Sequence, residues 1–123
     1  RPNLELHGSF LPFYGITREE IDSEKAYRLY TEMAAITHLT ADDPPAMLTY
    51  GFPDRDADPN TELNFVVHHP RFGIKLKEEM DPLGIECVVV YHGLDGKTLV
   101  RHGGGELENR LEFIRRQFEK VAE

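Results

Sequence analysis

Residues 70–91 read PRFGIKLKEEMDPLGIECVVVY, and this stretch decides the fold class. Pro70 suits the first turn of a helix, and Gly84 suits its end. The apolar residues that recur between them at four-residue spacing are Phe72, Leu76 and Met80. Residues 85–91 then form an apolar run with three consecutive valines and no alternation, which is typical of a strand covered on both faces in a parallel sheet. The stretch therefore predicts a helix followed by a buried strand.

A second strand is expected before this helix. Residues 46–50 (AMLTY) form a short apolar run between the turn signals DDPP at 42–45 and GFPD at 51–54. A strand, a helix and a strand within about 45 residues make a βαβ unit, which has two parallel strands and a right-handed crossover. We therefore expect an α/β protein.

Helical signals flank this unit on both sides. Thr17 and Glu20 have the spacing of a capping box, and Ser23 offers a second N-cap, so residues 17–34 are expected to form two short helices or one broken helix. A glycine-rich stretch at 93–105 precedes a terminal helix. One face of that helix is marked by the apolar residues Leu107, Leu111, Ile114, Phe118 and Val121.

The composition fits a single domain with a modest core. Of the 123 residues 40% are apolar, and the lone Cys87 cannot form an internal disulfide. The 22 acidic and 14 basic residues leave a net charge of −8, which argues against nucleic acid or an anionic membrane as a partner. No apolar run approaches the roughly 20 residues that span a bilayer.

The sequence THLTADDPP at 37–45, followed by the 46–50 strand and by Gly51 and Asp54, resembles the C-terminal half of α/β-hydrolase esterases of the carboxylesterase, lipase and feruloyl-esterase group. The resemblance covers residues 23–123, and residues 1–22 would correspond to a cap or insertion segment. It implies the C-terminal portion of an α/β-hydrolase fold, with parallel strands and flanking helices and with the N-terminal half missing.

The resemblance also implies two residues of a catalytic triad. Asp54 fits the family's acid, which follows a strand, accepts a hydrogen bond from a histidine and stabilises the imidazolium. Aligned from the last helix, His102 overlays the family's base after several inserted residues. An alignment without gaps places Gly96 at that position and leaves His92 as the second candidate. If neither histidine approaches Asp54, the chain is a catalytically dead homologue.

The nucleophile of such an enzyme is absent from this chain. It contains no Gly-x-Ser-x-Gly sequence, and its only serines, Ser9 and Ser23, lack the glycine-flanked elbow that exposes a catalytic hydroxyl. An intact hydrolase domain is about twice this length. We therefore expect a fragment, without an initiator Met, of a serine carboxylic-ester hydrolase. A companion N-terminal chain would supply the serine, the substrate would be a small-molecule ester, and no cofactor is implied. A cytoplasmic location is favoured, and secretion stays open because a signal peptide would lie upstream of Arg1.

Two stretches of the sequence contain residue types that can bind a metal ion. The alternating carboxylates of residues 54–58 resemble the start of an EF-hand loop, but Pro59 stands where that loop requires glycine. His68 and His69 are adjacent, so their side chains diverge, and no third ligand has the expected spacing. We expect no metal, and instead a helix start with one histidine near backbone groups.

The alternative function is a non-catalytic binding or assembly module with a half-hydrolase architecture. A half-sheet leaves the 46–50 strand with an unpaired edge, and an exposed apolar edge strand favours association. Both functions therefore predict a companion chain or a homodimer.

Overall fold

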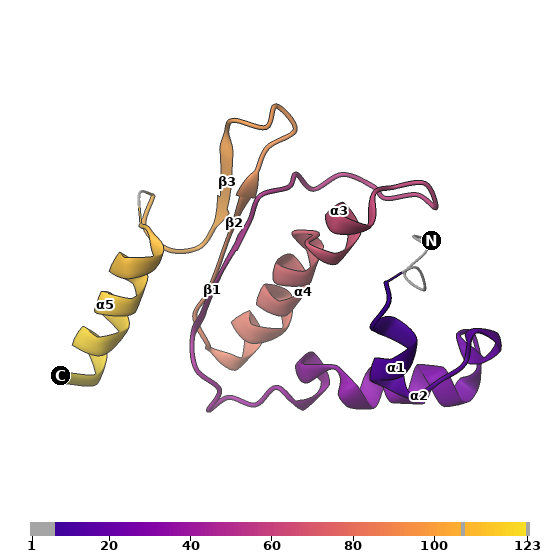
Figure 1. Ribbon diagram of the computed structural model, residues 1–123. Coiled ribbons are helices and arrows are strands. Elements are labelled where there is room, and N and C mark those ends of the chain that lie inside the picture. Colours follow the sequence, from indigo (N-terminus) through magenta and orange to yellow (C-terminus); the bar gives the residue numbers. More distant parts are fainter. Residues whose placement is uncertain (1–6, 107, 123) are drawn as a thin grey trace. The chain divides into compact units, whose positions relative to one another are not determined.

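The computed structural model describes residues 7–106 and 108–122, and Figure 1 shows its elements. In chain order these are α1 (Phe10–Tyr14), η2 (Arg18–Glu20), α2 (Glu24–Met33), η3 (Ala35–His38), β1 (Ala46–Tyr50), α3 (Leu63–Val67), α4 (Arg71–Met80), η4 (Asp81–Leu83), β2 (Cys87–His92), β3 (Leu99–His102) and α5 (Arg110–Ala122), where η marks a 3₁₀ helix. The chain divides into two compact units. The helical unit comprises residues 1–39 and 56–67, and the sheet unit comprises residues 40–55 and 68–123.

The sheet unit contains the expected βαβ arrangement. Its three strands lie in the order β1, β2, β3, and β1 pairs with β2 in parallel, with Ala46 opposite Cys87 and Tyr50 opposite Tyr91. Helix α4 connects these two strands in the chain and packs on β2. Residues 87–91 are all buried, which confirms the prediction of a strand covered on both faces.

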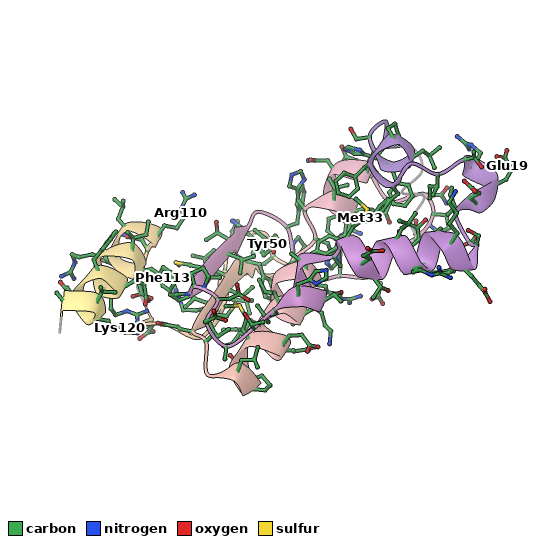
Figure 2. The ribbon with its side chains drawn as sticks, turned by 90° about the horizontal axis from the view of Figure 1, so that it is seen from below. Glu19, Met33, Tyr50, Arg110, Phe113 and Lys120 are labelled. Carbon is green, nitrogen blue, oxygen red and sulfur yellow. The ribbon has the colours of Figure 1, made fainter. Side chains whose placement is uncertain are left out.

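Helices cover both faces of this sheet (Figure 1). Because side chains alternate along a strand, Val88 and Val90 share one face, where they pack with Phe113 of α5. Phe113 projects from α5 toward the strands (Figure 2). The opposite face carries Tyr50, whose ring lies against Gly73 of α4. The protein is thus mixed α/β, with one helix on each side of a small mixed sheet.

The helical unit follows its predicted start signals. The carboxylate of Glu20 accepts from the Thr17 N–H at 2.9 Å, and the Ser23 hydroxyl accepts from the Ala26 N–H at 3.1 Å. The core of this unit consists of Ile16, Ile21 and Ala26, surrounded by Phe10, Leu11, Tyr14, Leu29 and Tyr30. Residues 7–22 of the expected cap segment therefore share a core with α2, whereas residues 1–6 lie outside the described residues.

The glycine-rich stretch contains a strand that the sequence analysis did not predict. β3 pairs antiparallel with β2, with Val89 opposite His102. The carboxylate of Asp95 accepts from the N–H groups of Lys97 and Thr98, both at 2.9 Å. These hydrogen bonds and one from the Thr98 hydroxyl, which has the largest effect, lower the pKa of Asp95 to about 2. Gly96, at φ 69°, supplies the left-handed residue that the turn requires.

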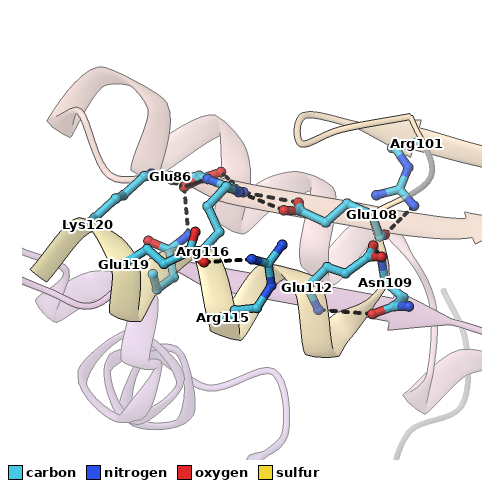
Figure 3. A network of polar contacts seen from close by, with 10 residues as sticks. Glu86, Arg101, Glu108, Asn109, Glu112, Arg115, Arg116, Glu119 and Lys120 are labelled. Carbon is cyan, nitrogen blue, oxygen red and sulfur yellow. Dashed lines mark hydrogen bonds and ion pairs between the residues drawn. The ribbon is translucent and has the colours of Figure 1, made fainter. Parts of the chain in front are cut away.

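The terminal helix presents a different face to the sheet from the one expected. Leu111, Ile114, Phe118 and Val121, named here the α5 stripe, are 50–86% exposed, whereas Phe113 is buried. Leu107, expected on the same face, lies outside the described residues. A polar network between α5 and the carboxylates of Glu86 and Glu108 accounts for this orientation (Figure 3). Arg116 bonds both Glu86 and Glu108, and Lys120 also bonds Glu86, so the face that carries these residues is held inward.

Candidate functional site

Polar side chains gather at the carboxyl ends of the two parallel strands. The loop 51–54 follows β1, Tyr91 lies near the end of β2, and α4 begins at Arg71. In α/β proteins this edge of a parallel sheet is where ligands commonly bind. The predicted acid, Asp54, lies in that loop, and the predicted base, His102, is the last residue of β3.

Asp54 is held by an arginine. Its Oδ1 accepts a hydrogen bond from Nε of Arg71 at 2.7 Å, and the two side chains are 32% and 55% exposed, respectively. The other carboxylate oxygen, Oδ2, has no hydrogen-bond partner within the described residues. One side of the carboxylate is thus fixed by a cation, and the other side can accept a further donor.

His102 contacts the hydroxyl of Tyr91. Its Nε2 lies 3.1 Å from that oxygen, and the two rings stack with centroids 5.6 Å apart. Burial, and secondly the negative charge of Asp54, raise the pKa of Tyr91. The hydroxyl therefore stays protonated at neutral pH and can donate to Nε2 of His102.

The two predicted triad members are not bonded to each other, and each is related to Tyr91 in a different way. In residues 7–106 and 108–122, no hydrogen bond joins Asp54 to His102. Tyr91 is coupled to both, because it bonds the imidazole and its hydroxyl responds to the carboxylate charge. Tyr91 and Arg71 were missed by the sequence analysis. Tyr91 could have been found as the penultimate residue of a parallel strand, where side chains reach the ligand edge.

His92, the second candidate for the base, serves a different role. It lies next to Tyr91 in β2, so its side chain leaves the sheet on the opposite face. Its Nδ1 lies 3.1 Å from the carbonyl oxygen of Gly96, within the hairpin turn. The structure does not bring His92 into the cluster around Asp54.

His69 lies beside the same loop and is buried, with 7% of its surface exposed. Its Nδ1 accepts from the backbone N–H of Arg71 at 3.1 Å, and its Nε2 lies 2.8 Å from the carbonyl oxygen of Arg55. Because Nδ1 is an acceptor, the ring proton resides on Nε2 and is donated to that carbonyl. The expectation of one histidine near backbone groups at a helix start is confirmed.

No group of three or more His, Cys, Asp or Glu side chains gathers around a possible metal position anywhere in the described ranges. No helix within the described residues is long and apolar enough to cross a membrane.

Comparison with known proteins finds no matching family model, no matching curated protein and no matching solved structure.

Proposed function

We propose that this chain supplies the acid and the base of a serine carboxylic-ester hydrolase, with Asp54 as the acid and His102 as the base. The observation that carries the proposal is the 3.1 Å contact of His102 with the hydroxyl of Tyr91 at the carboxyl edge of the sheet, together with the effect of the Asp54 charge, which raises the pKa of that hydroxyl. The serine comes from a companion chain, and the substrate is a small-molecule ester.

In the proposed reaction His102 accepts the serine proton as the hydroxyl attacks the ester carbonyl. The imidazolium then returns the proton to the departing alcohol, which leaves an acyl-enzyme that water hydrolyses by the same route. Asp54 stabilises the imidazolium through Oδ2, the oxygen that Arg71 leaves open. This requires the His102 ring to exchange the Tyr91 hydroxyl for a contact with Asp54 and the serine.

The order of elements supports the same proposal. The resemblance implies a strand, an acidic loop, a helix, a strand, a histidine and a last helix, and the sheet unit has these elements in this order. The hairpin strand β3, which carries His102 at its end, is an addition to that order. It accounts for the inserted residues in the alignment that favours His102.

A labelling experiment tests the proposal. The sample is the chain purified under conditions that retain any polypeptide bound to it. A fluorophosphonate is added, and intact masses identify which polypeptide is labelled. We expect a labelled companion chain, with the labelling rate reduced about 10³–10⁴-fold in Asp54→Asn and by a comparable factor in His102→Gln. Asp56→Asn and His92→Gln serve as matched controls, since they change the same groups nearby, and should label at the wild-type rate. An unlabelled preparation, or a wild-type rate in Asp54→Asn, would refute the proposal.

A second candidate function, a non-catalytic assembly module, is favoured by the α5 stripe. Its four residues follow one another at spacings of three, four and three, which is the seam spacing of paired helices. Strand β1 adds an open edge, because it is the outermost strand of the described sheet. The module would bury both features against a companion chain or a second copy.

A further inference from the structure

His69 joins the backbones of two residues that both bear on Asp54. Arg55, whose carbonyl oxygen accepts from Nε2, is the residue that follows Asp54 in the loop. Arg71, whose N–H donates to Nδ1, is the residue whose guanidinium holds Asp54. One imidazole therefore connects the acidic loop to the start of α4 at the two points that set the Asp54–Arg71 distance.

The backbone contacts are better suited than the ion pair to fix this geometry. The Arg71 side chain is 55% exposed, and ion pairs this open to water are weak and mobile on their own. His69 is buried, so neither of its ring nitrogens has ready access to a replacement water. The buried ring is thus better placed than the exposed guanidinium to hold the backbone on both sides of Asp54 and Arg71 in one arrangement.

The chemistry of the ring requires one protonation state. Only the neutral Nε2–H tautomer satisfies an acceptor at Nδ1 and a donor at Nε2 together. A proton added at Nδ1 would face the Arg71 N–H, which is also a donor. The two backbone contacts therefore assign the Nε2–H tautomer to His69, whether or not the chain belongs to an enzyme.

We propose that His69 is the positioning residue for Asp54: by holding the Arg55 carbonyl and the Arg71 N–H, it orients the Asp54–Arg71 ion pair so that Oδ2 is presented to the base. The catalytic meaning of this role rests on the proposed hydrolase function. The positioning itself can be measured separately. An experiment can therefore refute the positioning role of His69 without refuting the hydrolase function, and the reverse.

The first measurement is made by ¹H–¹⁵N NMR on the full chain. The imidazole nitrogens of His69 should report an Nε2–H tautomer at neutral pH. The side-chain Nε–H resonance of Arg71, which reports its bond to Asp54, should move in His69→Leu to the position that it takes in Asp54→Asn. His68→Leu, a matched change at the exposed neighbouring histidine, should leave that resonance in place.

Two conservative variants protect the test against loss of the fold. His69→Asn keeps an acceptor near the Nδ1 position, and His69→Gln keeps a donor near the Nε2 position, so each should shift the Arg71 resonance only part of the way. In the labelling assay His69→Leu should reduce the rate about 10–100-fold, the range found when groups that orient metal-ligating side chains are removed. An Nδ1–H tautomer, or an unmoved Arg71 resonance in His69→Leu, overturns the positioning role. A shifted resonance in a protein with no labelled companion upholds the positioning role and refutes the hydrolase.

Discussion

Glu86, which directly precedes β2, is the residue through which α5 is held against the sheet. Its carboxylate accepts hydrogen bonds from Arg116, Gln117 and Lys120, each with a contact of 2.9 Å (Figure 3). The Arg116 bond is the main reason that the pKa of Glu86 falls from 4.5 to about 2, although burial opposes the change. Its side chain is 27% exposed, so water screens these contacts only in part.

The lowered pKa of Glu86 predicts a specific dependence of stability on pH. Because the folded-state value lies below the unfolded one, the stabilisation is complete above about pH 4.5 and is lost as the pH falls toward 2. After allowance for screening, the loss is about 1–2 kcal/mol. Urea unfolding at several pH values should show this loss in the wild type, and a weaker pH dependence in Glu86→Gln. Glu79→Gln, at an exposed pair with Lys75, is the control. Equal slopes in wild type and Glu86→Gln would contradict the assignment.

At the scale of the element, Gly73 determines how closely α4 approaches β1. A Cβ at this position would lie 2.7 Å from Cε2 of Tyr50 and 2.9 Å from its hydroxyl oxygen. Alanine gains about 1 kcal/mol in helix propensity, but overpacking costs about 1–3 kcal/mol. We therefore expect Gly73→Ala to lower the free energy of unfolding by about 1 kcal/mol. Denaturant titration checks this against Gly51→Ala, where no atom lies within 4 Å. A more stable Gly73→Ala would show that the Tyr50 ring yields easily.

The sequence predicted those elements whose characteristic spacing of apolar residues lies within the element itself. β1, α4 and β2 have apolar spacings that only one kind of element satisfies. β1 and β2 formed within two residues of the expected ranges, whereas α4 ends at Met80 and the 3₁₀ helix η4 fills the rest of the stretch to Leu83. β3 was missed because a run of glycines suggested a loop, although Asp95 and Gly96 form a favoured hairpin dipeptide between two β-prone segments. The orientation of α5 depends on Glu86, which is distant in sequence, and no spacing within the helix reveals that partner.

In the candidate site, too, the sequence predicted a residue from its own loop but not the contacts between distant segments. The loop after β1 made Asp54 a candidate, because acidic residues at strand ends form a recognisable pattern. Its partner Arg71 and the contact of His102 with Tyr91 depend on how β2, β3 and α4 come together. Side-chain pairs of that kind are set by tertiary packing, which a single sequence does not encode in any one segment.

At the scale of the whole molecule, the α5 stripe predicts self-association or capture of a companion chain. Exposed apolar patches of this kind are uncommon on monomers. Sedimentation of the purified chain at tens of micromolar should show species larger than a monomer, and Phe118→Asp should restore the monomer. Phe72→Asp is the control, since Phe72 is 60% exposed on α4 and lies outside the stripe. A wild-type chain that sediments as a monomer throughout this range would argue against the assembly module.

The contact between His69 and the Arg55 carbonyl also closes a loop in the chain. Residues 56–67, between these two anchors, belong to the helical unit, whereas both anchors belong to the sheet unit. Once the ends of a loop are fixed, doubling its length costs only about 0.6 kcal/mol in closure entropy. Within this segment α3 carries the buried Phe65 and Val66, so the exposed residues 58–60 are the part that can lengthen, or accept a grafted sequence, at little thermodynamic cost while the acidic loop keeps its position.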